Sequence, residues 1–273
     1  MTKHLCACAI IVAFAGSAFG QNSIVVPNAF ETQAGTGTFL GPLANAPRTN
    51  QLIIHASQLE DIVGQDITGL SWRRTQSATT GWPAETVTYF AYDILLSDGV
   101  DPAFRQFDFS ANVVGPQTIV RSGELVISPF AFPGGAVPNE FGVDISFDTP
   151  WTYAGGNLVI EIIHTGFTGT STSVDAITAS SGGPLGYLTD FAAVWQGTSG
   201  VLQGNFSIVK LITEGGAPTC PPDLNGDGVV DADDFFLFLQ LFAAGDMRAD
   251  FNNDGVIDAD DFFAFLNAFA QGC

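Results

Sequence analysis

The stretch Asp223-Leu-Asn-Gly-Asp-Gly-Val-Val-Asp-Ala-Asp-Asp234 places carboxylate and amide side chains at alternate positions of a glycine-containing loop. The same pattern returns as Asp250-Phe-Asn-Asn-Asp-Gly-Val-Ile-Asp-Ala-Asp-Asp261. Residues 223–245 and 250–272 align without gaps, with 16 of 23 positions identical. Such self-similarity indicates a duplicated supersecondary unit.

The spacing of the oxygen-bearing side chains predicts two calcium ions. Calcium takes about six to eight oxygen ligands, so a chain that binds it curls and presents oxygens at alternate positions around a sharp turn. The predicted ligands are the side chains at loop positions 1, 3, 5, 9 and 12 and the backbone carbonyl at position 7: Asp223, Asn225, Asp227, Val229, Asp231 and Asp234, then Asp250, Asn252, Asp254, Val256, Asp258 and Asp261. The alternative is two acidic turns in a solvated tail. We favour calcium, because both copies fill every ligand position.

Each loop is followed by a predicted helix with one apolar stripe. Apolar residues recur at i, i+3, i+4 and i+7, namely Phe235, Phe238, Leu239 and Phe242 in the first copy and Phe262, Phe265, Leu266 and Phe269 in the second. We expect the two stripes to pack against each other. No helix-forming segment precedes the first loop, where Cys220 stands directly before two prolines.

Residues 220–273 resemble the type I dockerin domain. The shared features are duplicated calcium loops, one helix after each loop and Asp at position 12. The opening Cys220-Pro-Pro and the terminal Gly272-Cys273 resemble the GC-type variant of exported planctomycete-like bacterial proteins. The resemblance implies calcium-dependent folding and docking onto a cohesin-like or other surface receptor protein.

The resemblance also implies where a docking partner would bind. Dockerins often use loop positions 10 and 11 and the following helix; here these positions are Ala232 and Asp233, and Ala259 and Asp260, in place of the common Ser-Thr pair. Phe236 and Phe263 stand one step off the apolar stripes. They either contact a partner or widen the core face.

The cysteines and the N-terminus predict export. A basic start, an apolar run from Leu5 to Phe14 and small residues before Gln21 are typical of a secretory signal peptide over residues 1–20. The run is shorter than the ~20 residues of a membrane span. Cys220 and Cys273 then remain, and we favour a disulfide between them. The alternative is a free Cys273 used for covalent attachment.

Composition restricts the partners. The net charge is −20, with 28 acidic and 8 basic residues, so nucleic acid and anionic membrane surfaces are expected to be poor partners. Residues 220–273 alone carry 11 acidic residues and one arginine. A segment this acidic favours cations.

Residues 21–213 are predicted to form a β-sandwich or jelly-roll domain, joined by a linker over residues 214–219. Short apolar runs alternate with turn residues, and no sustained helical period is present, which favours an all-β fold. The expected strands are 51–55, 67–73, 86–96, 118–120, 124–128, 141–147, 158–164 and 206–212. Arg73-Arg74 is interpreted as a solvated strand end.

No catalytic motif stands out in residues 21–213. His55 and His164 lie inside apolar runs and are interpreted as structural residues with local hydrogen bonds. Asp93, Asp144 and Glu161 could supply a glycosidase pair, but sequence alone places no two of them across a cleft. Four tryptophans, Trp72, Trp82, Trp151 and Trp195, suggest sugar stacking, although core packing is the favoured interpretation.

The leading hypothesis is therefore an exported, non-enzymatic protein, secreted or held at the cell surface by its calcium-binding module. The alternative is a polysaccharide-active enzyme or carbohydrate-binding module that carries a dockerin as its address. A calcium sensor is a third, weaker interpretation.

Overall fold

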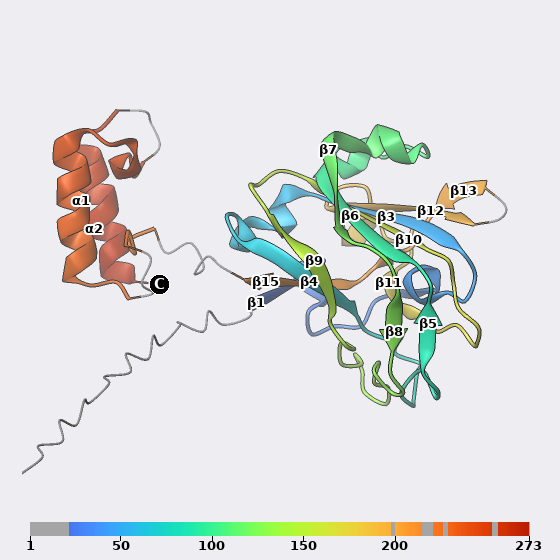
Figure 1. Cartoon of the computed structure of the whole chain (residues 1–273). Coiled ribbons are helices and arrows are strands. Elements are labelled where there is room, and N and C mark those ends of the chain that lie inside the picture. Colours follow the sequence, from blue (N-terminus) through green and yellow to red (C-terminus); the bar gives the residue numbers. More distant parts are fainter. Residues whose placement is uncertain (1–21, 198–199, 215–220, 226–228, 253–255, 273) are drawn as a thin grey trace, which may run out of the picture.

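The computed structural model describes residues 22–197, 200–214, 221–225, 229–252 and 256–272. Within these residues the chain is mainly β, with several sheets and two C-terminal helices (Figure 1). The predicted signal peptide, Cys220 and Cys273 lie outside the described residues, as does the predicted linker except for Glu214. Glu214 is the last residue of a strand.

The largest sheet has six strands in the order β13-β12-β3-β10-β6-β7. The strands are β13 (Gly200–Gln203), β12 (Phe191–Gly197), β3 (Arg48–Ile54), β10 (Leu158–His164), β6 (Tyr92–Gly99) and β7 (Val113–Arg121). Every neighbouring pair is antiparallel. β10 lies between β3 and β6, and its sequence Leu-Val-Ile-Glu-Ile-Ile-His has the branched side chains that favour strands.

A second sheet has the order β1-β15-β4-β9. Its strands are β1 (Asn22–Val26), β15 (Val209–Glu214), β4 (Asp66–Trp72) and β9 (Ile145–Thr152). Smaller sheets have the orders β14-β11-β2 and β5-β8, formed by β14 (Phe206–Ser207), β11 (Val174–Ile177), β2 (Gly37–Phe39), β5 (Val87–Tyr89) and β8 (Leu125–Ile127).

The two larger sheets contribute to one hydrophobic core. Leu52 and Ile160 from the six-stranded sheet and Leu70 and Leu211 from the four-stranded sheet belong to the same buried cluster. The opposite face of the six-stranded sheet carries a small separate cluster that includes Ile53 and Val159. Alternate residues of one strand therefore serve different faces, as expected for a pleated sheet.

Arg73 corrects the prediction of a solvated strand end. Its side chain is 1% exposed and lies 2.9 Å from the equally buried carboxylate of Asp175. The guanidinium also donates to the carbonyls of Phe30, Glu31 and Gln33. Because a charged group is buried only when its hydrogen bonds are satisfied, this cluster of acceptors explains an interior arginine.

Several strand predictions need correction at their boundaries. Residues 86–96 form two strands, since β5 ends at Tyr89 and β6, which belongs to another sheet, begins at Tyr92. Residues 206–212 are divided in the same way between β14 and β15. The alternation over 141–147 is wrong in its first half: β9 begins only at Ile145, and Val143 is 44% exposed.

The C-terminal part contains α1 (Ala232–Ala244) and α2 (Ala259–Gln271), which lie side by side (Figure 1). Their predicted packing is confirmed: Phe238 and Phe265 are fully buried in one cluster to which both helices contribute. Leu239 differs from the prediction, because it is 36% exposed while Leu241 is buried. Among the described residues, no helix combines the length and apolarity needed to cross a membrane.

Candidate metal centre

Each predicted calcium loop is closed by the carboxylate at its twelfth position. In the first loop, the backbone N–H of Asn225 donates to Asp234 Oδ1 over 3.0 Å, and the N–H of Asp231 donates to Asp234 Oδ2 over 3.0 Å. Asp234 is fully buried. One side chain thus joins the start of the loop to the residue that begins the helix.

The second loop repeats this arrangement. Asp261 Oδ1 accepts from the N–H groups of Phe251 and Asn252 over 2.8 and 3.1 Å, and Oδ2 accepts from Asp258 over 2.9 Å. The bond from Asp258 is the main cause that lowers the pKa of Asp261 below its ordinary value, although burial opposes it. Interaction with the Asp250 side chain also lowers the pKa of Asp261. Two carboxyl groups at opposite ends of the loop therefore converge.

The ninth residue of each predicted calcium loop explains where the following helix begins. Asp231 is the N-cap of α1, its side chain accepts from the N–H of Asp233, and with Asp234 it forms a capping box. Asp258 and Asp261 make the same capping box on α2. Such caps satisfy backbone N–H groups that have no partner within the helix.

The remaining predicted ligands are only partly described. Asp223, Asn225, Val229, Asp250, Asn252 and Val256 all take part in further interactions. The Val229 and Val256 side chains are 57% and 58% exposed, which is compatible with ligation through their backbone carbonyls. Asp227 and Asp254 lie outside the described residues.

The donor set fits a hard cation. The predicted side-chain ligands are carboxylates and amides, and carboxylate oxygens that accept one N–H retain further acceptor capacity. Among the described residues, which include neither Asp227 nor Asp254, no group of three or more His, Cys, Asp or Glu side chains is close enough to hold a metal ion. The ligand prediction therefore stays a prediction.

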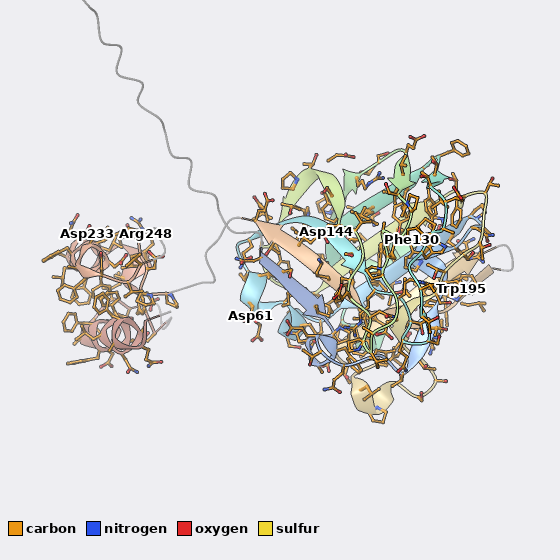
Figure 2. The ribbon with its side chains drawn as sticks, turned by 90° about the horizontal axis from the view of Figure 1, so that it is seen from below. Asp61, Phe130, Asp144, Trp195, Asp233 and Arg248 are labelled. Carbon is orange, nitrogen blue, oxygen red and sulfur yellow. The ribbon has the colours of Figure 1, made fainter. Side chains whose placement is uncertain are left out.

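The predicted partner-binding residues lie on the outside of the helical part. Ala232, Asp233, Ala259 and Asp260 are exposed, and Figure 2 labels Asp233 at the margin of α1. Phe236 and Phe263 are 58% and 64% exposed. Of the two interpretations given to these phenylalanines, the structure therefore favours a surface position over a wider core.

The two histidines of the β-rich part lie apart. Ile54 pairs with Leu158 and Arg48 pairs with His164, so His55 and His164 stand at opposite ends of these strands, about 23 Å apart at the usual strand rise. His164 Nε2 lies 2.8 Å from the Gly41 carbonyl, and its Nδ1 accepts from the N–H of Gly166. Burial lowers the pKa of His164 to about 4. Both ring nitrogens are thus used by the neutral imidazole.

The three carboxylates considered for a glycosidase pair also interact with neighbouring residues. Asp144 pairs with Lys210 over 2.7 Å. Glu161 accepts from the amides of Gln51 and Gln117. Asp93, which lies on the strand beside that of Glu161, accepts from Ser122 and from the N–H of Gly123.

The tryptophans divide into packing residues and one that borders a cavity. Trp72 is fully buried and Trp82 is 7% exposed, so core packing is confirmed for both. Trp151 packs partly buried against the same core. Trp195, at the edge of the β-rich part in Figure 2, lines a cavity of about 300 Å³.

Sequence reasoning missed two polar residues near that cavity, Arg48 and Asn50. Asn50 is 1% exposed, and neither atom of its amide has a hydrogen-bond partner among the described residues. The sequence does contain one indication of Asn50, because it is an amide within the strand segment Arg48-Thr-Asn-Gln-Leu-Ile-Ile54.

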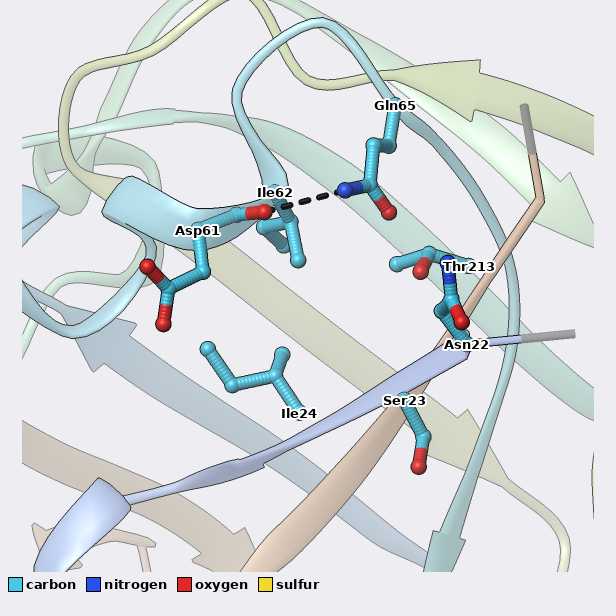
Figure 3. A pocket seen from close by; sticks show the side chains of 7 residues that line it. All are labelled: Asn22, Ser23, Ile24, Asp61, Ile62, Gln65 and Thr213. Atoms are coloured by element: carbon cyan, nitrogen blue, oxygen red, sulfur yellow. Dashed lines mark hydrogen bonds between the residues drawn. The ribbon is translucent and has the colours of Figure 1, made fainter. Parts of the chain in front are cut away.

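A second cavity, of about 250 Å³, lies beside β1 and β15 (Figure 3). Gln65 Nε2 donates to the Asp61 carbonyl over 2.9 Å. Gln65 Oε1 and Thr213 Oγ1 are buried without a partner among the described residues. None of the residues predicted from sequence as site residues lines this cavity.

No protein-family model matches the chain, and no curated protein matches it.

Proposed function

We propose that residues 220–273 form a dockerin-like module that binds two calcium ions and docks an exported β-sandwich domain at the cell surface or in an extracellular assembly. The observation that carries the proposal is the repeated closure of each loop by its twelfth residue. Asp234 and Asp261 each accept N–H groups from both ends of their loop. In an acidic turn of a solvated tail, the carboxylates would be exposed to water, whereas Asp234 and Asp261 are buried.

Charge supports a cation as the partner of these loops. The module holds 11 acidic residues against one arginine. That arginine, Arg248, is bound to Asp246 over 2.7 Å, outside the predicted ligand set. Calcium, when bound, would supply the positive charge that offsets repulsion among the loop carboxylates.

The chain's own residues would prepare the site. Asp231 and Asp258 start the helices, while Asp234 and Asp261 hold the loop ends together. Helix packing through Phe238 and Phe265 then fixes the two loops on one small body. A 54-residue module has a small core, so ion binding would contribute much of its stability.

Docking is assigned to the surface formed by Ala232, Asp233 and Phe236 in one repeat and Ala259, Asp260 and Phe263 in the other. All six are exposed. Large exposed aromatics are common anchors of protein interfaces. Because both repeats carry the same residues, either could face a receptor protein.

Circular dichroism of the full chain with and without calcium tests the proposal. We expect helix content to rise on calcium addition, and Asp223→Ala combined with Asp250→Ala to remove the change. Asp233→Ala combined with Asp260→Ala is the matched control, since these exposed carboxylates are not predicted ligands. Identical spectra for calcium-loaded and calcium-free protein would contradict the two-site proposal.

Docking has a separate test on isolated host cell envelopes. We expect calcium-dependent retention of the chain, and loss of retention in the Phe236→Ser and Phe263→Ser double variant. Ile119→Ser is a suitable control, because Ile119 is 59% exposed in the β-rich part. Equal retention of the double variant and the control would remove these phenylalanines from the docking surface.

A further inference from the structure

The cavity beside Trp195 has a wall that is both aromatic and cationic. The Arg48 guanidinium carbon lies 5.2 Å from the centroid of the Trp195 ring, and Phe39 meets the same ring edge-on at 6.1 Å. Arg48, Phe39 and Trp195 all line the cavity, together with the hydroxyl-bearing Thr38 and Ser173. The wall therefore combines a fixed positive charge, aromatic rings and hydroxyl groups.

Arg48 has no carboxylate partner among the described residues. The ion pairs within that part of the chain belong to other cations, such as Arg73 and Lys210. The guanidinium of Arg48 donates to the carbonyl of Pro47 over 2.9 Å, which uses one of its five N–H groups. Donors remain for an anionic ligand, and a guanidinium binds a carboxylate through two parallel hydrogen bonds.

Asn50 is a buried polar residue next to this cavity. It faces Trp195 across the pairing of β3 and β12, and it lies two residues from Arg48 on the same face of β3. Its amide is buried and lacks a partner at both atoms among the described residues. A Cβ placed on the cavity-lining Gly41 would lie 2.4 Å from Asn50 Oδ1, so the amide stands directly behind that wall. Buried amides without partners are rare in native proteins.

We propose that this cavity binds a sugar that carries a carboxylate, such as a uronic acid unit of an acidic polysaccharide. Arg48 would hold the carboxylate, the rings of Trp195 and Phe39 would contact the apolar face of the sugar, and Thr38 and Ser173 would exchange hydrogen bonds with its hydroxyls. A volume of about 300 Å³ suits a single sugar unit. The chain's net charge of −20 repels anions at a distance, so recognition depends on direct contact with Arg48.

Titration of the full chain with galacturonate and with galactose, followed by calorimetry and tryptophan fluorescence, tests the proposal. The two sugars differ in the carboxylate. We expect galacturonate to bind roughly tenfold or more tightly than galactose, because a guanidinium bonds a carboxylate strongly. Arg48→Gln should remove the preference, and Arg48→Lys, which keeps the charge without the planar fork, should weaken it.

Arg105→Gln is the matched control, because Arg105 also lies over an aromatic ring, that of Phe107 at 4.7 Å, but does not line this cavity. It should leave binding unchanged, as should the calcium-loop variant Asp223→Ala with Asp250→Ala. Three results would overturn the proposal: no saturable binding of galacturonate, an unchanged preference in Arg48→Gln, or equally tight binding of benzoate, which would point to an aromatic acid instead.

Discussion

Phe238 and Phe265 occupy the same position in the two repeats and stack face to face, with ring centroids 4.1 Å apart and planes 4° from parallel. When equivalent residues of a duplicated unit contact each other, the two copies are related by an approximate two-fold axis that passes near the contact. The duplication seen in sequence is thus also a duplication in space. Phe236 and Phe263 follow the same relation and remain exposed.

Phe238→Ala should unfold the helical part and leave the β-rich part intact. Phe238 is fully buried, and removal of a buried phenylalanine costs about 3–5 kcal/mol, which is large for a module of this size. Calorimetry of the full chain would show the loss of one transition. All four tryptophans lie between Trp72 and Trp195, so tryptophan fluorescence should report an unchanged β-rich transition.

Phe236→Ala is the control for that experiment, since it removes the same side chain from an exposed position two residues earlier. Its unfolding temperature should stay close to that of the unchanged protein. A loss as large as that of Phe238→Ala would mean that the two-helix core is wrongly described.

Asp175→Asn should destabilise the β-rich part by about 3–5 kcal/mol, because it leaves the charge of Arg73 buried without its anion. Urea denaturation followed by tryptophan fluorescence measures the effect. Asp144→Asn breaks the more exposed pair with Lys210, for which we expect at most about 1 kcal/mol. Similar losses in the two variants would contradict the special role of the buried pair.

His164 should make the stability of the β-rich part depend on pH. Its pKa falls from the ordinary 6.5 to about 4 in the folded protein, so between these values the unfolded chain binds more protons. The free energy of unfolding should therefore fall as pH drops from about 6.5 to about 4, by at most about 3 kcal/mol. Urea denaturation at several pH values, at constant calcium, gives the slope.

His164→Gln separates this contribution from that of the carboxylates, because glutamine does not titrate. The difference in stability between the two proteins should change over the same pH range and level off below pH 4. An NMR titration that finds the pKa of His164 near 6.5 would refute the prediction.

The sequence pattern predicted those strands whose residues form a continuous run of apolar, mostly β-branched side chains. Residues 158–164 are strand β10 with the predicted boundaries. Strand β12, Phe-Ala-Ala-Val-Trp-Gln-Gly, was not predicted, because its small residues derive their strand conformation from pairing with β3 and β13. Likewise, the burial of Arg73 depends on carbonyls at residues 30–33, and a local pattern carries no information about such distant contacts.

The sequence predicted part of the candidate calcium site, but not how its closing carboxylates are buried. Spacing alone predicted the helices that follow the two loops, and the structure contains both. It did not reveal that Asp234 and Asp261 would be buried and accept N–H groups from across their loops. The cavity of Arg48, Phe39 and Trp195 joins residues from three separate strands, so only the fold brings it together.

Calorimetric titration of the full chain with calcium measures how many ions the two loops bind. We expect two calcium ions per chain, and the loss of both in the variant that combines Asp223→Ala with Asp250→Ala. The Asp233→Ala and Asp260→Ala control should keep both. Absence of binding heat in the unchanged protein, or the same stoichiometry in the double loop variant, would contradict the account.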